Sequence, residues 1–142
     1  MKVDKVLETY LYSRNLDAAQ KFYSEILGLK LHPRSGDRHL FFQCGDSMVM
    51  IFNPNETNQS AQAVPAHGSS GPGNIAFSIP ESDISHWYDY LLKKGIKIVV
   101  DIVWPGGGKS LNFRDESNNS VELVSPRMWG LGDQINYVKV KD

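Results

Sequence analysis

The sequence predicts an α+β fold in which one domain, residues 1–142, contains two β-α-β-β-β units. Three observations support this prediction. The chain of 142 residues is long enough for one core, the hydrophobic period changes in the same order twice, and landmarks of the two halves recur at a nearly constant spacing. We assign residues 5–53 to the first unit, 54–73 to a linker, 74–125 to the second unit and 126–142 to a tail.

The first unit begins with a predicted strand at residues 5–12 and a predicted helix at 16–27. Alternation along the strand places one set of residues on the same face: Val6, Glu8, Tyr10 and Tyr12. Asn15 can cap the helix, whose apolar positions recur every three or four residues, and Gly28 can end it. Turn-forming residues then separate three predicted strands, at 29–34, 38–44 and 48–52.

The second unit repeats this order after a linker that is rich in Asn, Ser, Gly and Pro and shows neither period. A strand is predicted at 74–78, and Pro80 can start a helix that Gly95 ends. Strands at 96–104, 110–114 and 120–124 complete the unit. Superposition of the units pairs three landmarks at offsets of 66, 67 and 72 residues: Glu8 with Asn74, Gly28 with Gly95, and Met50 with Glu122.

Composition excludes several classes of protein. The formal net charge is −1 and the 15 Lys and Arg residues are scattered, so no basic stripe is available for nucleic acid. No apolar stretch approaches the roughly 20 residues that cross a bilayer, and the polar start lacks the apolar core of a secretory signal. We therefore expect a cytoplasmic protein with neither a nucleic-acid nor a membrane partner.

Several segments together resemble a known superfamily. They are Ser13-Arg14-Asn15-Leu16, residues 22–28, residues 74–77, residues 112–115 and Val121-Glu122-Leu123. At these residues the chain resembles the vicinal oxygen chelate superfamily, which includes glyoxalase I, fosfomycin-resistance enzymes, extradiol dioxygenases and bleomycin-binding proteins. The resemblance implies a cup-shaped, partly closed mixed sheet with helices outside, a small-molecule ligand inside the cup, and a homodimer.

The resemblance also implies a set of metal-ligand positions inside the cup: Glu8, Met50, Asn74 and Glu122. Glu122 keeps the usual residue, whereas Glu8 and Asn74 stand where histidine is usual and Met50 stands where four-ligand members carry glutamate. These departures argue against a complete glyoxalase I site. They also argue against an extradiol dioxygenase, because its ferrous iron needs two imidazoles and one carboxylate.

The duplicated fold should bring the carboxylates of Glu8 and Glu122 near one another inside the concave site, where two like charges need compensation. If Glu8 and Glu122 are the catalytic pair, a divalent metal ion such as Mg²⁺ or Mn²⁺ could be held by Glu8, Asn74 and Glu122, an oxygen-rich set. The carboxylates could instead share a proton. A third alternative is a basic neighbour, for which there are four candidates: Arg14, Arg38, Arg114 and His39.

Strand parity with Glu8 predicts an aromatic and methionine lining for the cup, which suits a flat ligand. We expect the following residues to bind substrate: Tyr10, Tyr12, Met48, Met50, Phe52, His67 and Trp104. His67 lies in the linker, where it could close over the cup.

Three functional hypotheses follow from these residues. The first is a metal-assisted lyase, isomerase or dioxygenase that acts on a small oxygen-bearing substrate, with Glu8 or Glu122 moving a proton. The second is a non-catalytic protein of the bleomycin-resistance type that sequesters a drug-like ligand, and the third is a structural or partner-binding domain. A homodimer is also expected from the apolar residues of the tail: Trp129, Leu131, Ile135, Tyr137 and Val138.

Overall fold

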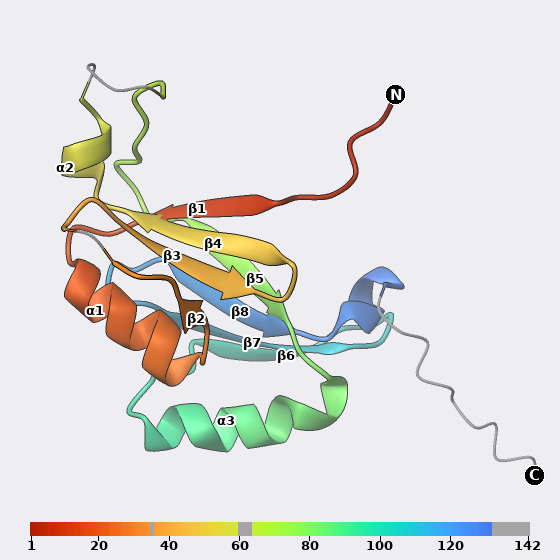
Figure 1. The fold of residues 1–142 in the computed structure, drawn as a ribbon. Helices are drawn as coiled ribbons and strands as arrows, with labels where there is room; N and C mark the ends of the chain where they lie inside the picture. Colours follow the sequence, from red (N-terminus) through yellow and green to blue (C-terminus); the bar gives the residue numbers. More distant parts are fainter. Residues whose placement is uncertain (35, 60–63, 132–142) are drawn as a thin grey trace, which may run out of the picture.

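Two four-stranded mixed sheets form the framework of the protein (Figure 1). The computed structural model describes residues 1–34, 36–59 and 64–131. Sheet A has the order β1 (Glu8–Tyr12), β4 (Ser47–Phe52), β3 (His39–Cys44) and β2 (Lys30–Leu31). Sheet B has the order β5 (Asn74–Ser78), β8 (Ser120–Val124), β7 (Lys109–Arg114) and β6 (Val100–Val103). This arrangement confirms the predicted α+β fold, and the sheets are not closed into a barrel.

The helices occupy the predicted places in each unit. In the first unit, α1 (Leu16–Gln20) continues as the π-helix η1 (Lys21–Ile26), and in the second a 3₁₀ turn η2 (Glu81–Asp83) leads into α3 (Ile84–Lys93). The Asn15 side chain accepts the Ala18 N–H at 3.0 Å, as expected of an N-cap.

Two further short helices were not predicted: α2 (Pro54–Thr57), inside the linker, and the 3₁₀ turn η3 (Pro126–Trp129). The last two strands of each unit agree with the prediction to within one residue, but three other strands are shorter. β1 covers Glu8–Tyr12 of the predicted 5–12. β2 covers Lys30–Leu31 of the predicted 29–34, and β6 covers Val100–Val103 of the predicted 96–104.

Strand pairing confirms the predicted repeat. In sheet A the parallel strands β1 and β4 place Tyr10 opposite Met50. In sheet B the parallel strands β5 and β8 place Ala76 opposite Glu122. Met50 and Glu122 therefore hold the same position in their units, as do Glu8, which is opposite Met48, and Asn74, which is opposite Ser120. Gly28 and Gly95, which follow the two helices, both have φ of +75°.

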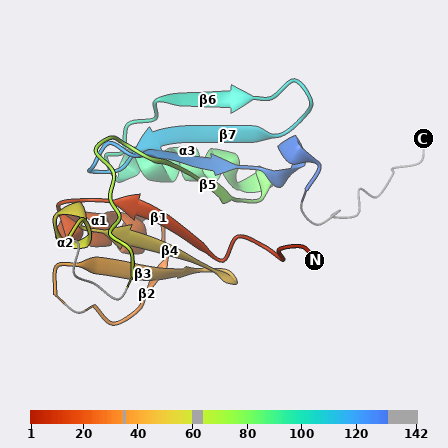
Figure 2. The ribbon, with the colours of Figure 1, turned by 90° about the horizontal axis from the view of Figure 1, so that it is seen from above.

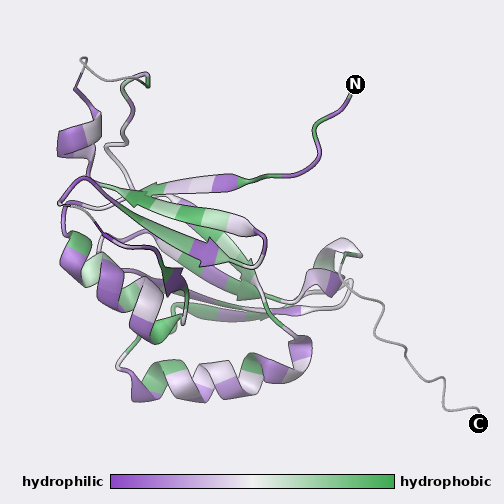
Figure 3. Cartoon of the chain, in the orientation of Figure 1, coloured by the Kyte–Doolittle hydropathy of each residue, from purple (hydrophilic) through white to green (hydrophobic). Residues whose placement is uncertain are grey.

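The two units share one hydrophobic core beneath both sheets. Buried residues of sheet A, sheet B and both long helices form a single cluster, in which the rings of Phe22 and Phe113 lie 6.1 Å apart. The Tyr90 hydroxyl on α3 also donates to the Ile26 carbonyl at 3.0 Å. Apolar residues accordingly run along the strands, whereas α1 and α3 mix apolar and polar residues (Figure 3).

One face of each sheet is left without a helix. Figure 1 shows α1 and α3 on the same side of the molecule, and Figure 2 shows the sheets side by side with β1 and β5 at the neighbouring edges. Because the helix-covered faces meet at a common core, the uncovered faces of sheets A and B point away from that core. They are therefore separate surfaces of the chain.

A buried carboxylate ties the units together. Asp115 Oδ2 accepts the Tyr23 hydroxyl at 2.7 Å and the Asn119 side-chain amide at 2.9 Å. Its Oδ1 accepts the backbone N–H groups of Ser117 and Asn119 at 2.9 and 2.8 Å. Tyr23 is fully buried, and this burial, together with the charge of Asp115, raises its pKa. The phenol therefore stays protonated as a donor from the first unit to the second.

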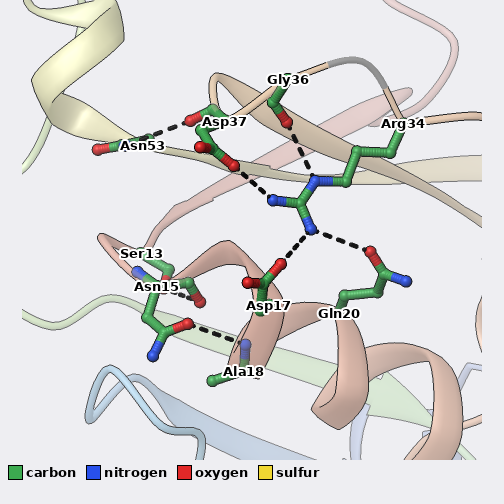
Figure 4. A network of polar contacts seen from close by, with 9 residues as sticks. All are labelled: Ser13, Asn15, Asp17, Ala18, Gln20, Arg34, Gly36, Asp37 and Asn53. Atoms are coloured by element: carbon green, nitrogen blue, oxygen red, sulfur yellow. Dashed lines mark hydrogen bonds and ion pairs between the residues drawn. The ribbon is translucent and has the colours of Figure 1, made fainter.

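A second polar network positions the segment after β2 (Figure 4). The Arg34 guanidinium contacts the Asp17 carboxylate at 2.6 Å and the Asp37 carboxylate at 2.7 Å. Its Nε donates to the Gly36 carbonyl at 3.0 Å. Both carboxylates are exposed, so these ion pairs add little net stability, but they hold the segment against α1.

The Tyr23–Asp115 bond predicts a stability change. Tyr23→Phe should lower the free energy of unfolding by about 1.5–3 kcal/mol, because it removes a buried hydrogen bond to a charged group. Urea unfolding measures this difference. The control is Tyr88→Phe, since Tyr88 is 36% exposed on α3, and it should change stability by less than about 0.5 kcal/mol. Equal stability of Tyr23→Phe and the parent would contradict the assigned role.

Candidate functional site

The uncovered face of sheet A carries most of the residues expected to bind substrate. Leu11, Val49 and Ile51 are buried on the helix side, so the alternate residues of the same strands face away from the core. These residues are Glu8, Tyr10 and Tyr12 on β1 and Met48, Met50 and Phe52 on β4. On β3, the same parity adds His39 and Phe41, which pair with Phe52 and Met50.

Six rings gather on this face, with Phe52 at their centre. We name them the aromatic patch: Tyr10, Tyr12, His39, Phe41, Phe52 and His67. The ring of His67 meets that of Phe52 edge-on at 4.7 Å, and Tyr10 meets Phe52 at 5.1 Å. Phe52 is buried beneath its neighbours, whereas Tyr10 is 45% exposed. The patch therefore offers a partly open aromatic surface of the kind that binds flat molecules.

His67 joins the patch from the linker. Its backbone N–H donates to the Thr57 carbonyl at 3.0 Å, and its Nδ1 lies 2.8 Å from the Tyr12 hydroxyl. Burial raises the pKa of Tyr12, so its hydroxyl stays protonated and can donate to Nδ1 or accept from it, according to the tautomer of His67. When Tyr12 donates, the neutral imidazole carries its proton on Nε2; when Tyr12 accepts, Nε2 is an acceptor. The patch thus presents a polar ring nitrogen beside its rings.

Two further polar groups border the patch. The Tyr10 hydroxyl donates to Glu8 Oε2 at 2.7 Å, and this hydrogen bond, with burial, raises the pKa of Tyr10. The His39 imidazole stacks on the Phe41 ring at 4.0 Å. Burial and the positive charge of Arg38 lower the pKa of His39, which favours the neutral ring. Arg38 itself lies over the Phe52 ring at 5.8 Å.

Sheet B presents a different uncovered face. Asn74 and Ala76 on β5, together with Ser120 and Glu122 on β8, lie on the face away from the buried residues of the same strands. The side chains on this face are polar or small, whereas those on the uncovered face of sheet A are mostly aromatic. Trp104 lies in the turn between β6 and β7, where its Nε1 donates to Ser110 Oγ at 3.2 Å. Asn74, Glu122 and Trp104 are therefore not part of the aromatic patch of the same chain.

Glu8 lies on sheet A and Glu122 on sheet B, each on the uncovered face, so their meeting inside one cup stays a prediction. Among the described residues, no group of three or more His, Cys, Asp and Glu side chains could hold a metal ion. The donors Glu8, Asn74 and Glu122 have the oxygen chemistry that Mg²⁺ and Mn²⁺ prefer, and they are divided between sheet A (Glu8) and sheet B (Asn74 and Glu122).

Sequence reasoning missed part of the patch. Phe41 was not singled out, and Arg38 and His39 were considered only as partners of a carboxylate. The alternation along the predicted strand 38–44 could have shown that His39 and Phe41 share a face. It could not have shown which face of the sheet that is. That choice depends on pairing with β4, which the sequence does not show directly.

Comparison with known proteins identifies the family. The sequence model of the Glyoxalase/Bleomycin resistance protein/Dioxygenase superfamily matches residues 3–123. The chain therefore belongs to this superfamily, and the resemblance inferred from its motifs is confirmed. Among solved structures, it is similar to a lactoylglutathione lyase from Agrobacterium tumefaciens, with 31% identity and a TM-score of 0.88 over 92% of this chain and 100% of that chain.

Two other similar proteins carry names that refer to different activities. A Bacillus subtilis (strain 168) protein named "Putative ring-cleaving dioxygenase MhqE" is 29% identical over 87% of this chain, which spans 42% of that protein. The fosfomycin resistance protein FosX from Mesorhizobium loti has a TM-score of 0.60 at 22% identity, over 88% of this chain and 93% of its own, and supports the fold alone. Among the described residues, no helix is long and apolar enough to span a bilayer.

Proposed function

We propose that the protein binds a small, flat, oxygen-bearing molecule on the aromatic patch, in a cup that a second copy of the chain completes. The observation that carries this proposal is the patch itself, with the Tyr12–His67 pair set among the rings. The rings supply flat apolar contact, and with Tyr12 donating to Nδ1, the Nε2 proton of His67 supplies a donor for a ligand oxygen. A cytoplasmic location remains a prediction from the sequence.

The need for a second copy follows from the open faces. A single chain leaves sheet A without a facing wall, and Tyr10 is 45% exposed there. Sheet B offers a polar wall, also built of four strands, but on another surface of the same chain. Pairing sheet A of one copy with sheet B of the other would enclose the patch and bring Glu8 toward the partner's Asn74 and the partner's Glu122.

A homodimer is further supported by the apolar end of the described chain. Trp129 and Leu131, in and after η3, are 73% and 68% exposed. The other apolar residues of the predicted interface, Ile135, Tyr137 and Val138, lie outside the described residues.

A metal-assisted lyase, isomerase or dioxygenase is the second candidate function. The 31% identity to a protein titled lactoylglutathione lyase favours it, and so does the oxygen-donor set that the dimer would assemble: Glu8 with the partner's Asn74 and Glu122. A divalent ion bound there would polarise a substrate oxygen. Glu8 could take up a proton from the substrate, with the Tyr10 hydroxyl stabilising its carboxylate. Without a metal, the same cup would sequester its ligand.

The proposed dimer predicts the mass of the protein in solution. Sedimentation at micromolar concentration should give twice the chain mass of 15.9 kDa. Met50→Glu should shift the protein toward monomer, because it places a charge at the centre of the face that the partner covers. Leu92→Glu is the matched control, since Leu92 is 48% exposed on α3. A parent protein that stays monomeric at high concentration would refute the completed cup.

The aromatic patch predicts binding of a planar probe. In an NMR titration, 2-naphthamide, a flat neutral molecule with a carbonyl oxygen, should shift the ring resonances of Phe41, Phe52 and His67. Tyr10→Ala should weaken binding by about two- to tenfold, the usual worth of one ring pair. Tyr88→Ala, an equally large truncation on α3, should leave the affinity unchanged. Unshifted patch resonances at millimolar probe would contradict the proposed binding face.

The metal hypothesis makes a separate prediction for Glu122. Calorimetric titration of chelator-treated protein with MnCl₂ or MgCl₂ should show binding in the parent and none in Glu122→Gln, because the substitution removes a ligand and its charge. The melting temperature of the parent should rise with metal concentration by mass action. Glu25→Gln, an exposed site on η1, is the control and should bind like the parent. The absence of heat in the parent would favour the metal-free binding protein.

A further inference from the structure

A hollow lies beside the aromatic patch, where the parallel strands β1 and β4 end. Its volume is about 460 Å³. Three segments line it: Arg14, two residues after the end of β1; helix α2 with Asn58, the residue that follows it; and the part of the linker that follows His67. The lining residues are Arg14, Pro54, Asn55, Asn58, Gly68, Ser69 and Ser70. We name this hollow the Arg14 pocket.

The chemistry of the Arg14 pocket suits an anion. Among the described lining residues Arg14 supplies the single formal charge, and the side chains of Asn55, Asn58 and Ser70 are neutral and can donate hydrogen bonds. Within the part of the chain that the structure describes, no salt bridge involves Arg14, whereas Arg34 contacts two carboxylates. A guanidinium fork of this kind matches the paired oxygens of a carboxylate or phosphate.

The pocket and the patch are joined through two short stretches of backbone. Tyr12 belongs to the patch and Arg14 to the pocket, two residues further along the chain. Likewise His67 belongs to the patch and Gly68 to the pocket. Gly68 borders the pocket wall, since a Cβ there would lie in ordinary contact with Pro54 Cβ, at 3.5 Å. A ligand on the rings could therefore extend an acidic group into the pocket.

We infer that the ligand of this protein is an aromatic acid whose planar body lies on the aromatic patch and whose anionic group lies in the Arg14 pocket. This inference rests on the proposed binding function and names the class of its ligand. Carboxylates and phosphate monoesters share a pair of charged oxygens that a guanidinium fork can contact side by side, and the probes below distinguish them.

The test compares three probes with one ring system: 2-naphthoate, 2-naphthyl phosphate and neutral 2-naphthamide. Calorimetry should show at least one acid binding the parent about tenfold or more tightly than the amide, as expected for charge-assisted hydrogen bonds. Arg14→Gln should reduce the affinity for that acid to the level of the amide and leave the amide unaffected. Lys93→Gln, which removes a positive charge from exposed α3, is the control and should behave like the parent.

The outcomes separate this inference from the proposed function. If the amide binds the patch but neither acid binds more tightly, the aromatic-acid assignment is wrong and the proposed function stands. The assignment is also wrong if Arg14→Gln keeps the preference for the acid. If no probe shifts the patch resonances, the proposed function fails as well. A preferred carboxylate or a preferred phosphate supports the inference and identifies which acid the pocket accepts.

Discussion

The Asp115 carboxylate is the group on which the placement of both faces depends. It is 7% exposed and accepts four hydrogen bonds, one of them from Tyr23 of the other unit. A buried charge is tolerated only when it is satisfied in this way, so the carboxylate requires the two units to keep their relative position. If the two units moved apart, water would reach the shared core, and the uncovered faces would no longer keep a fixed orientation relative to one another.

The helix of the first unit is shaped to reach this carboxylate. The Leu27 N–H bonds to the Phe22 carbonyl, five residues back, which widens the turn into a π-helix. Phe22 and Tyr23, which are neighbours in the chain, are both buried there, with Phe22 against Phe113 and Tyr23 against Asp115. A regular amphipathic pattern does not indicate this widening, and the sequence therefore predicted an ordinary helix.

What the sequence could predict follows from the range over which each signal acts. Strand alternation and the offset between Glu8 and Asn74 are local patterns, and they predicted the strands, their faces and their register. The relative placement of the units depends on contacts between residues about 90 apart, such as Tyr23 and Asp115, which no periodicity reports. For that reason the patch residues of β1 and β4 were predicted together, whereas the expected meeting of Glu8 and Glu122 in one cup stays a prediction.

The uncovered faces of sheets A and B differ in chemistry, and this difference suggests how a duplicated unit can bind one ligand. Tyr10 and Met50 in sheet A correspond to Ala76 and Glu122 in sheet B, so one copy of the repeat carries ring contacts and the other carries small and charged residues. Neither face alone combines aromatic contact with a second carboxylate. The proposed two-fold pairing of chains would set each aromatic face against a polar one and generate two equivalent cups. The asymmetry within the chain would then make a symmetric dimer chemically complete.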